Sequence, residues 1–368
     1  MRLRAEQTGS LLRPPALMVA RGRYAEGLMF LETLREIEDE SIRVAVARQR
    51  DIGLDIVSDG ELRRGSWLTG MAEAVDGFMP DSVRLLWHGP GVRAEQTSAK
   101  IVGAKLQKRR KLTELELPLM LKLSASLGVP FKVTVPAPSN FVPTGFKFNV
   151  TDRVYKDREA LLADLTAIIR DEIEWLISHG VTYIQVDAPF YSHYLDPEHR
   201  KAMEISGSDP DRAFDMMARG DNSAWAGLPR DGMTLAVHVC RGNSRSRWYA
   251  EGSYDAIAEK LFATLDVDRY LLEYDNDRAG SFKPLRFVPP GKDIVLGLVT
   301  TKEPALERED DIRRRIDEAS KYVPLEHLAL SPQCGFASVA AGNLLTEEDQ
   351  WKKLELVVSV ARKTWGDK

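Results

Sequence analysis

The stretch TLAVHVCR, residues 234–241, reads as a buried strand that runs into a loop. Side chains two positions apart on a strand lie on the same face of the sheet. His238 and Cys240 therefore share a face at the end of this strand, with Val239 on the opposite face. An imidazole and a thiol in this position are able to contact one atom. The chemistry of the chain then depends on what its other strands bring to the same end.

Short runs of β-branched residues recur along the chain and alternate with segments of helical periodicity, which favours βαβ units around a parallel sheet. The eight candidate strands are 5–10, 55–61, 131–137, 182–189, 234–241, 269–275, 293–300 and 328–334. Helices are expected at 34–50, 114–127, 157–179, 310–322 and 347–363, with capping boxes at Thr113–Glu116 and Thr346–Asp349. Eight alternations predict a single α/β domain over 1–368 with the (β/α)8 TIM barrel fold, whose catalytic side chains lie at the carboxyl-terminal rim of the strands.

Two segments depart from this alternation. Residues 80–111 are expected to form a hairpin inserted before the third strand. Residues 190–230, after the fourth strand, are long, polar and rich in Gly and Pro, which predicts a loop that covers the substrate.

Composition narrows the class of partner. Apolar residues make up 43% and charged residues 29% of the chain, and the net charge of −4 gives no general attraction to nucleic acid or to an anionic membrane. No window approaches the ~20 apolar residues of a membrane span, and no apolar segment follows the basic start. We therefore expect a cytoplasmic protein that acts on small molecules, with a homo-oligomer left open. A lone disulfide would be unusual in that compartment, so a metal or catalytic role is expected for the two cysteines.

Four residues at strand ends suggest a metal site. Cys334 ends the last candidate strand, Glu273 ends the sixth, and in a barrel both lie at the rim with His238 and Cys240. Two thiolates, an imidazole and a carboxylate suit tetrahedral Zn²⁺, and ligands spread over several strands favour a catalytic rather than a structural ion. The alternatives are a core histidine beside a buried cysteine, and a Glu273 carboxylate paired with Arg278 or Lys283.

The segments HVCRGN (238–243), YLLEYDNDRAG (270–280) and LALSPQCGFAS (328–338) resemble the zinc-binding segments of the cobalamin-independent methionine synthase family. The resemblance covers essentially the whole chain, which is similar to the catalytic carboxyl-terminal half of the long members and to short stand-alone members. It implies that His238, Cys240, Glu273 and Cys334 bind zinc.

Such a metal is suited to hold a third sulfur, because coordination lowers the pKa of an incoming thiol and leaves it nucleophilic. The thiolate then attacks an electrophilic carbon directly, helped by positioning. Glu273, the hard ligand among soft ones, is the residue expected to loosen when substrate binds.

Acidic side chains at other strand ends suggest an amino acid as the thiol. Asp59, Glu61 and Asp187 are placed to bind an ammonium group, with helix caps or salt bridges between loops as the alternative. The resemblance implies that Glu61 and Asp187 hold the amino group of homocysteine, and that Thr8, Gly9 and Ser10 meet its carboxylate. Arg241, Arg245 and Arg247 follow the metal motif and offer contacts to a carboxylate, sulfonate or phosphate, unless local acids or solvent engage them.

Departures from the family pattern lie on the side of the methyl donor. Asn140 and Phe141 stand near the position where folate-using members have a tryptophan, which disfavours methyltetrahydrofolate. Lys302 stands where long members have a histidine thought to move protons, and Ala188 where they have a second acid. Candidate donor walls, each of which is as readily explained by plain packing, are Trp67, Phe141, Tyr191, His193 and Tyr194.

The sequence thus predicts a zinc-dependent enzyme that transfers a methyl or alkyl group to a thiol, most simply homocysteine. Related epoxyalkane:coenzyme M transferases make coenzyme M an alternative thiol. Two hypotheses of other classes remain: a metal-independent barrel lyase or decarboxylase, and a zinc-stabilised barrel that serves as a binding protein.

Overall fold

A parallel six-stranded sheet forms the centre of the molecule. The structure, a computed structural model, describes residues 3–89, 94–97 and 100–366. The strands lie in the order β10-β9-β8-β7-β6-β5, and each pair of neighbours is parallel. Their bounds are β5 Val133–Pro136, β6 Tyr183–Asp187, β7 Thr234–Val239, β8 Arg269–Glu273, β9 Asp293–Val299 and β10 Leu328–Pro332.

The first two predicted strands close this sheet into a barrel through isolated bridges. The parallel bridges are Ala5 to Leu330, Glu6 to Ile56 and Val57 to Phe131. They connect β10, by way of the first two segments, to Phe131, which lies two residues before β5. The sheet therefore closes on itself, and the predicted (β/α)8 TIM barrel is confirmed. Both segments are shorter than predicted. Positive φ angles at Gly60 and Glu61, 65° and 56°, turn the second chain segment away from the sheet and toward the rim.

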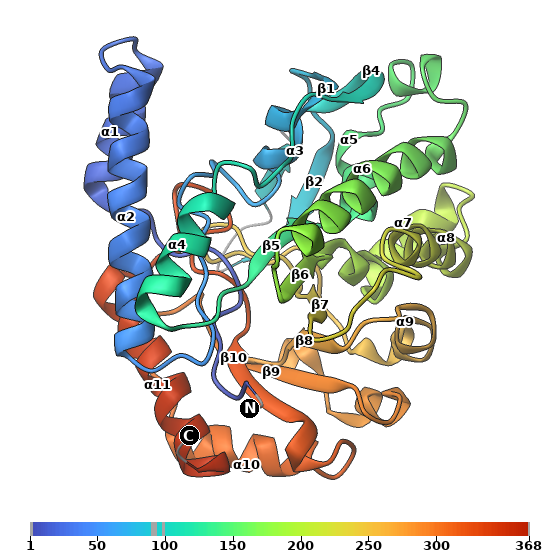
Figure 1. Cartoon of the computed structure of the whole chain (residues 1–368). Helices are drawn as coiled ribbons and strands as arrows, with labels where there is room; N and C mark the ends of the chain where they lie inside the picture. Colours follow the sequence, from blue (N-terminus) through green and yellow to red (C-terminus); the bar gives the residue numbers. More distant parts are fainter. Residues whose placement is uncertain (1–2, 90–93, 98–99, 367–368) are drawn as a thin grey trace.

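Helices surround the barrel (Figure 1). Their bounds are α1 Pro15–Ala25, α2 Leu31–Asp51, α3 Thr69–Ala74, α4 Leu117–Leu127, α5 Phe141–Gly145, α6 Arg158–Ser178, α7 Pro197–Ile205, α8 Pro210–Ser223, α9 Ala258–Thr264, α10 Glu309–Ala319 and α11 Glu347–Trp365. The 3-10 helices are η1 Pro138–Asn140, η2 Thr151–Arg153, η3 Pro189–Tyr194, η4 Tyr254–Ala256, η5 Asp277–Ala279, η6 Lys283–Phe287 and η7 Leu325–His327. Within the ranges that the structure describes, no helix has both the length and the apolar character needed to cross a membrane.

One of the two predicted capping boxes forms. The Thr346 side chain accepts a hydrogen bond from Asp349 N, and the Asp349 carboxylate accepts one from Thr346 N, at the start of α11. The box predicted at Thr113 is wrong. The Thr113 hydroxyl donates to the buried Glu172 carboxylate of α6 at 2.6 Å, and α4 begins only at Leu117. A hydrogen bond to a residue distant in the sequence therefore replaces the predicted helix cap.

The insertion is larger than the predicted hairpin at 80–111. It begins at Val75 and contains two antiparallel pairs, β1 with β4 and β2 with β3. The bounds are β1 Val75–Met79, β2 Arg84–Trp87, β3 Ala94–Thr97 and β4 Ile101–Lys108. Residues 90–93 and 98–99 of the predicted insertion lie outside the described ranges. In Figure 1 these strands lie at the opposite end of the molecule from α10.

The prediction of a long loop at 190–230 is wrong, because η3, α7 and α8 occupy most of it. Asp209 caps α8, Pro210 opens it, and Phe214, Met217 and Ala218 bury one face at helical spacing. The polar residues that suggested a loop lie on the opposite face of this amphipathic helix.

A buried carboxylate ties α8 to the loops at the rim. Asp221 accepts hydrogen bonds from Ser139 N at 2.7 Å, from the Ser139 hydroxyl at 2.6 Å and from the Tyr191 hydroxyl at 2.6 Å. Burial raises the pKa of Asp221 to about 6, although these donors act to lower it.

Because the pKa of Asp221 is raised on folding, the folded protein holds a proton between about pH 4 and 6 that the unfolded chain has released. This group then lowers the free energy of unfolding as pH rises through that window, by about 3 kcal/mol for about two pKa units. We expect Asp221→Asn to remove this slope. Denaturant unfolding of both proteins across the window measures it, and parallel curves would contradict the assignment.

Candidate metal centre and active site

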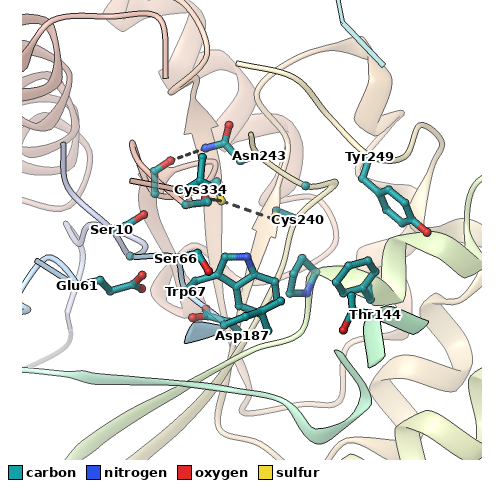
Figure 2. Close-up of a pocket in the computed structure, with 18 of the residues that line it drawn as sticks. Ser10, Glu61, Ser66, Trp67, Thr144, Asp187, Cys240, Asn243, Tyr249 and Cys334 are labelled. Atoms are coloured by element: carbon teal, nitrogen blue, oxygen red, sulfur yellow. Dashed lines mark hydrogen bonds between the residues drawn. The ribbon is translucent and has the colours of Figure 1, made fainter. Parts of the chain in front are cut away.

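Three potential metal ligands meet at the carboxyl-terminal rim of the barrel. His238 lies near the end of β7, Cys240 follows it, and Cys334 lies two residues beyond β10. All three are buried, and their ligand atoms lie within 4.8 Å of one another. The two Sγ atoms are 3.6 Å apart (Figure 2). Two sulfurs bound to tetrahedral zinc at about 2.3 Å are separated by roughly 3.8 Å, so the observed spacing suits the ion.

A neighbouring carboxylate orients the His238 ring. Nδ1 of His238 lies 3.0 Å from Oδ1 of Asp187, an atom that also accepts from the Gln185 side chain at 2.7 Å. Nε2 of His238 is buried and has no hydrogen-bond partner in the described part of the chain. Metal-bound histidines usually donate their second ring nitrogen to a carboxylate or carbonyl, which fixes the tautomer. The arrangement leaves Nε2 as the ligand atom.

The protonation of these groups reflects their mutual contact. The hydrogen bond between Cys334 and Cys240 and the nearby His238 hold the pKa of the Cys334 thiol well below its usual range, against the effect of burial. The contact with Cys334 and burial raise the pKa of Cys240 well above its usual value. Burial acts to lower the pKa of His238, but Asp187 and Cys334 raise it to about 10.

Glu273, the fourth predicted ligand, lies beside this group but not within it. It ends β8 and is fully buried. Oε2 accepts from Arg241 N at 2.8 Å, while Oε1 has no hydrogen-bond partner among the described residues and lies 3.6 Å from an Arg278 nitrogen. Burial acts to raise the pKa of Glu273, but Lys302 and Arg241 keep it below its usual range. The predicted alternative of an ion pair between Glu273 and Arg278 is therefore present, and Oε1 accepts no hydrogen bond among the described residues.

A cavity of about 480 Å³ opens onto the sulfurs. Predicted residues that line it are Gly9, Ser10, Glu61, Trp67, Phe141, Asp187, His238, Cys240 and Cys334. In Figure 2, Glu61 and Ser10 lie on one side of the cysteines, and Tyr249 and Thr144 lie on the other. The cavity thus has an acidic side and a largely aromatic side.

Glu61 and Asp187 form the acidic side. Glu61 takes a positive φ, and its Oε1 accepts from the Thr134 hydroxyl at 3.2 Å. Its Oε2 is buried without a partner in the residues described. Burial raises the pKa of Glu61 to about 7, with Arg64 opposing and Asp187 adding to the shift. A buried acid with an unused oxygen, next to a second carboxylate, suits a cationic ligand.

The aromatic side was missed in large part from the sequence. Phe78, Leu85 and Trp87 of the insertion line the cavity, together with Phe190 and Tyr249. Tyr249 packs against Phe190 at 5.2 Å and against Trp87 at 5.8 Å between ring centroids. Hydrophobic residues in an irregular insertion carry no periodicity that assigns them to a site, so only the concentration of aromatics in 67–87 was a signal.

Arg241 does not bind at the cavity as we expected. Its guanidinium is fully buried, donates to the main-chain oxygens of Gly252 and Glu273 at 2.6 to 3.0 Å, and stacks over Tyr254. Strand alternation turns this side chain away from the face that carries Cys240. Arg241 therefore positions the β7 and β8 ends rather than contacting substrate.

Several other predicted residues support the rim without lining the cavity. The Thr8 hydroxyl donates to Pro332 O at 2.6 Å. Asn140 donates to Asp187 O at 2.6 Å, and Asp59 accepts from Glu61 N at 3.0 Å. Each of these bonds fixes a residue next to the site. The three residues therefore lie in the predicted region but do not line the cavity, where direct contact with a substrate was expected.

Four more predicted residues, Tyr191, His193, Tyr194 and Lys302, do not line this cavity. The Tyr191 hydroxyl is engaged by Asp221. His193 is hydrogen-bonded through Nδ1 to the Tyr249 hydroxyl at 2.8 Å, and Tyr194 packs on Phe214. Lys302, buried, donates from Nζ to Gly242 O at 3.3 Å, and its positive charge acts on Glu273 and Cys334.

Known proteins are similar to this chain in sequence and in fold. Residues 149–363, more than half of the chain, match the family model "Cobalamin-independent synthase, Catalytic domain". "Uncharacterized protein YxjH" of Bacillus subtilis (strain 168) is 39% identical over 367 residues, covering 98% of this chain and 94% of its own. The "Methionine synthase" of Pyrococcus abyssi is 27% identical over 334 residues, covering 89% of this chain and 82% of its own.

A solved structure shows the same fold. The B12-independent methionine synthase from Shewanella sp. W3-18-1, in complex with selenomethionine, superposes with a TM-score of 0.75 at 19% identity, covering 99% of this chain and 98% of its own. The match to the family model and the 39% identity to YxjH rest on the sequence itself. The chain belongs to the cobalamin-independent methionine synthase family.

Proposed function

We propose that this protein is a zinc-dependent methyltransferase that acts on the thiol of an amino acid, most simply homocysteine, to give methionine. One observation carries the proposal: His238, Cys240 and Cys334 converge on the same cavity that contains the Glu61 and Asp187 carboxylates. Metal-ligating sulfurs and paired acids on one cavity match the two ends of a thiol-bearing amino acid.

The residues present fit zinc. The 3.6 Å sulfur spacing, the unpartnered Nε2 of His238 and the soft donor set all suit the ion. Oε1 of Glu273, which accepts no hydrogen bond among the described residues and would exchange its ion pair with Arg278 for the metal, is the proposed fourth ligand. Bound there, zinc supplies the positive charge that lowers the pKa of an incoming thiol. Lys302 adds positive charge beside Glu273 and is proposed to hold that carboxylate ionised during turnover.

The acidic side of the cavity is proposed to bind the substrate ammonium. Glu61 and Asp187 supply the negative charge, and Thr134 holds one Glu61 oxygen in place. Gly9 leaves room for the Glu61 carboxylate, because a Cβ at this position would lie only 3.3 Å from Oε1 of Glu61. Ser10, on the same side, is proposed to meet the substrate carboxylate.

The aromatic side is proposed to bind the methyl donor. Trp67, Trp87, Phe141, Phe190 and Tyr249 offer apolar faces for an extended or planar carrier. Tyr249 lies on the other side of the cysteines from Glu61 (Figure 2), and a donor bound beside it is proposed to present its methyl carbon to the thiol for direct transfer.

Coenzyme M is the less favoured thiol. A sulfonate is expected to recruit arginine, yet no arginine is among the described residues that line the cavity. Arg241 is committed to main-chain oxygens, and Arg245 is exposed. The acids of the cavity repel a sulfonate and attract an ammonium.

The test is a matrix of thiols and donors with the purified zinc-loaded protein. Homocysteine and coenzyme M are each combined with methylfolates, methylcobalamin, sulfonium compounds and epoxides, and the S-alkyl product is identified by mass spectrometry. Methionine is the expected product. Full activity in protein stripped of metal would refute the proposal.

Asp187 is expected to influence metal affinity through His238. Asp187→Asn weakens the hydrogen bond that fixes the His238 tautomer, and loss of such an outer partner reduces metal affinity by about 10- to 100-fold. Competition with a chromophoric chelator measures the change. Asp59→Asn is the matched control, because this nearby buried acid bonds to Glu61 N and to no metal ligand. Equal zinc affinity in Asp187→Asn and in the native protein would contradict the assignment.

A further inference from the structure

A second cluster of metal-binding side chains lies apart from the sulfurs. His88, Asp196 and His199 place ligand atoms within 4.8 Å of one another. His88 immediately follows β2 of the insertion, while Asp196 is the N-cap of α7 and His199 lies in the first turn of that helix. The cluster therefore joins the insertion to the connection after β6, two segments that are distant in the sequence.

The backbone holds these residues in place. His88 N donates to Trp248 O at 2.7 Å, and Trp248 N donates to His88 O at 3.0 Å. Oδ1 of Asp196 accepts from Glu198 N at 2.8 Å and His199 N at 3.2 Å, and Oδ2 accepts from Glu251 N at 2.8 Å. Each carboxylate oxygen offers about two lone pairs, so these bonds occupy Oδ1 and leave about one lone pair on Oδ2 for a metal ion.

The two imidazoles are not engaged by this carboxylate. Within the described ranges, no hydrogen bond or ion pair joins the ring of His88 or His199 to Asp196, although their ligand atoms lie within 4.8 Å of one another. Nδ1 of His199 is buried without a partner. An internal hydrogen-bond network therefore does not explain why two imidazoles and an acid converge here.

We propose that His88, Asp196 and His199 bind a second divalent transition-metal ion of the zinc class, independent of the cysteine centre. Two imidazoles and one carboxylate form a donor set used for zinc and related ions, with water completing the coordination. The set contains no sulfur, which distinguishes it chemically from the first site.

The ion would fasten the insertion to the barrel at the aromatic side of the cavity. Trp87, next to His88, lines the cavity and packs against Tyr249 at 5.8 Å. The ring of Tyr249 lies 4.6 Å from the ring of His199. Metal bound between His88 and α7 therefore restrains the part of the wall that faces the proposed methyl donor.

Cobalt titration separates this site from the cysteine centre. In a Cys240→Ser, Cys334→Ser background, Co²⁺ is expected to bind one equivalent per chain, with visible d–d bands and no thiolate-to-cobalt charge transfer. His88→Ala or His199→Ala in that background should weaken this binding by roughly 100-fold or more, since loss of an outer-shell partner alone costs 10- to 100-fold. His327→Ala is the control, because His327 pairs with Asp293 at 2.9 Å outside the cluster.

Asp196→Asn is a second test that is expected to keep the fold, because asparagine still caps α7 while the charge of the proposed ligand is lost. It should weaken Co²⁺ binding without a change in the circular dichroism spectrum. Zn²⁺ should also protect the insertion from proteolysis in the native protein but not in His88→Ala. The absence of a sulfur-free equivalent, or its retention in both histidine variants, would overturn the proposal. Neither result bears on the cysteine centre, because the two clusters share no residue.

Discussion

Cys334→Ser is expected to lose bound zinc and to reduce methyl transfer by more than roughly 100-fold. Removal of an outer-shell partner already costs 10- to 100-fold in metal affinity or activity, and Cys334 is a proposed ligand itself. A serine hydroxyl is not deprotonated near neutral pH and is a harder donor than the thiolate that the His238 and Cys240 environment favours. Metal analysis and the rate of methionine formation on the same samples measure both effects.

Ser338→Ala is the matched control for this change. The Ser338 hydroxyl lies 3.8 Å from Sγ of Cys334, so its loss perturbs the same pocket without removing a proposed ligand. It should retain zinc and most activity. Because Cys334 lies in a loop beyond β10, circular dichroism of Cys334→Ser should match that of the native protein. Full methionine formation by a metal-free Cys334→Ser protein would exclude the zinc mechanism.

The barrel was predictable from the sequence because its strands and helices carry different periodicities. The strand at 234–241 needed only alternation to place His238 and Cys240 on one face, and the structure brings Cys334 to the same point. The helices at 157–179 and 347–363 were predicted to within a few residues of α6 and α11. These features depend on the spacing of apolar and polar residues within one segment, which can be read directly from the sequence.

Features that depend on tertiary partners were not predictable. The Thr113 cap was lost to Glu172, and the Arg241 guanidinium was taken by main-chain oxygens, although both residues fit their predicted roles locally. The polar face of α8 had the composition of a loop. Trp87 reaches the cavity because an irregular insertion folds over the rim, where it packs against Tyr249 from the segment after β7. In each case, the deciding contact joins residues far apart in the sequence.

Glu61→Gln is expected to raise the KM for homocysteine by about 10- to 100-fold with a smaller effect on kcat. A hydrogen bond to a charged group contributes about 1.5 to 3 kcal/mol. The substitution removes the charged carboxylate that is proposed to accept such a bond from the substrate ammonium. The deamino analogue of homocysteine lacks that ammonium, so the same substitution should leave its KM nearly unchanged. Steady-state kinetics with both thiols separate loss of an amine contact from general damage.

The pH dependence gives an independent readout of the same contact. Because the pKa of Glu61 is about 7, this carboxyl is partly protonated at neutral pH in the free protein. Affinity for the ammonium thiol should therefore rise as pH increases through 7, and Glu61→Gln should flatten that rise. Glu116→Gln is the control: Glu116 is also buried and lies 3.6 Å from Arg64, but it does not line the cavity. If Glu116→Gln raised the KM for both thiols as much as Glu61→Gln, the charge around Arg64 rather than an amine contact would account for the effect.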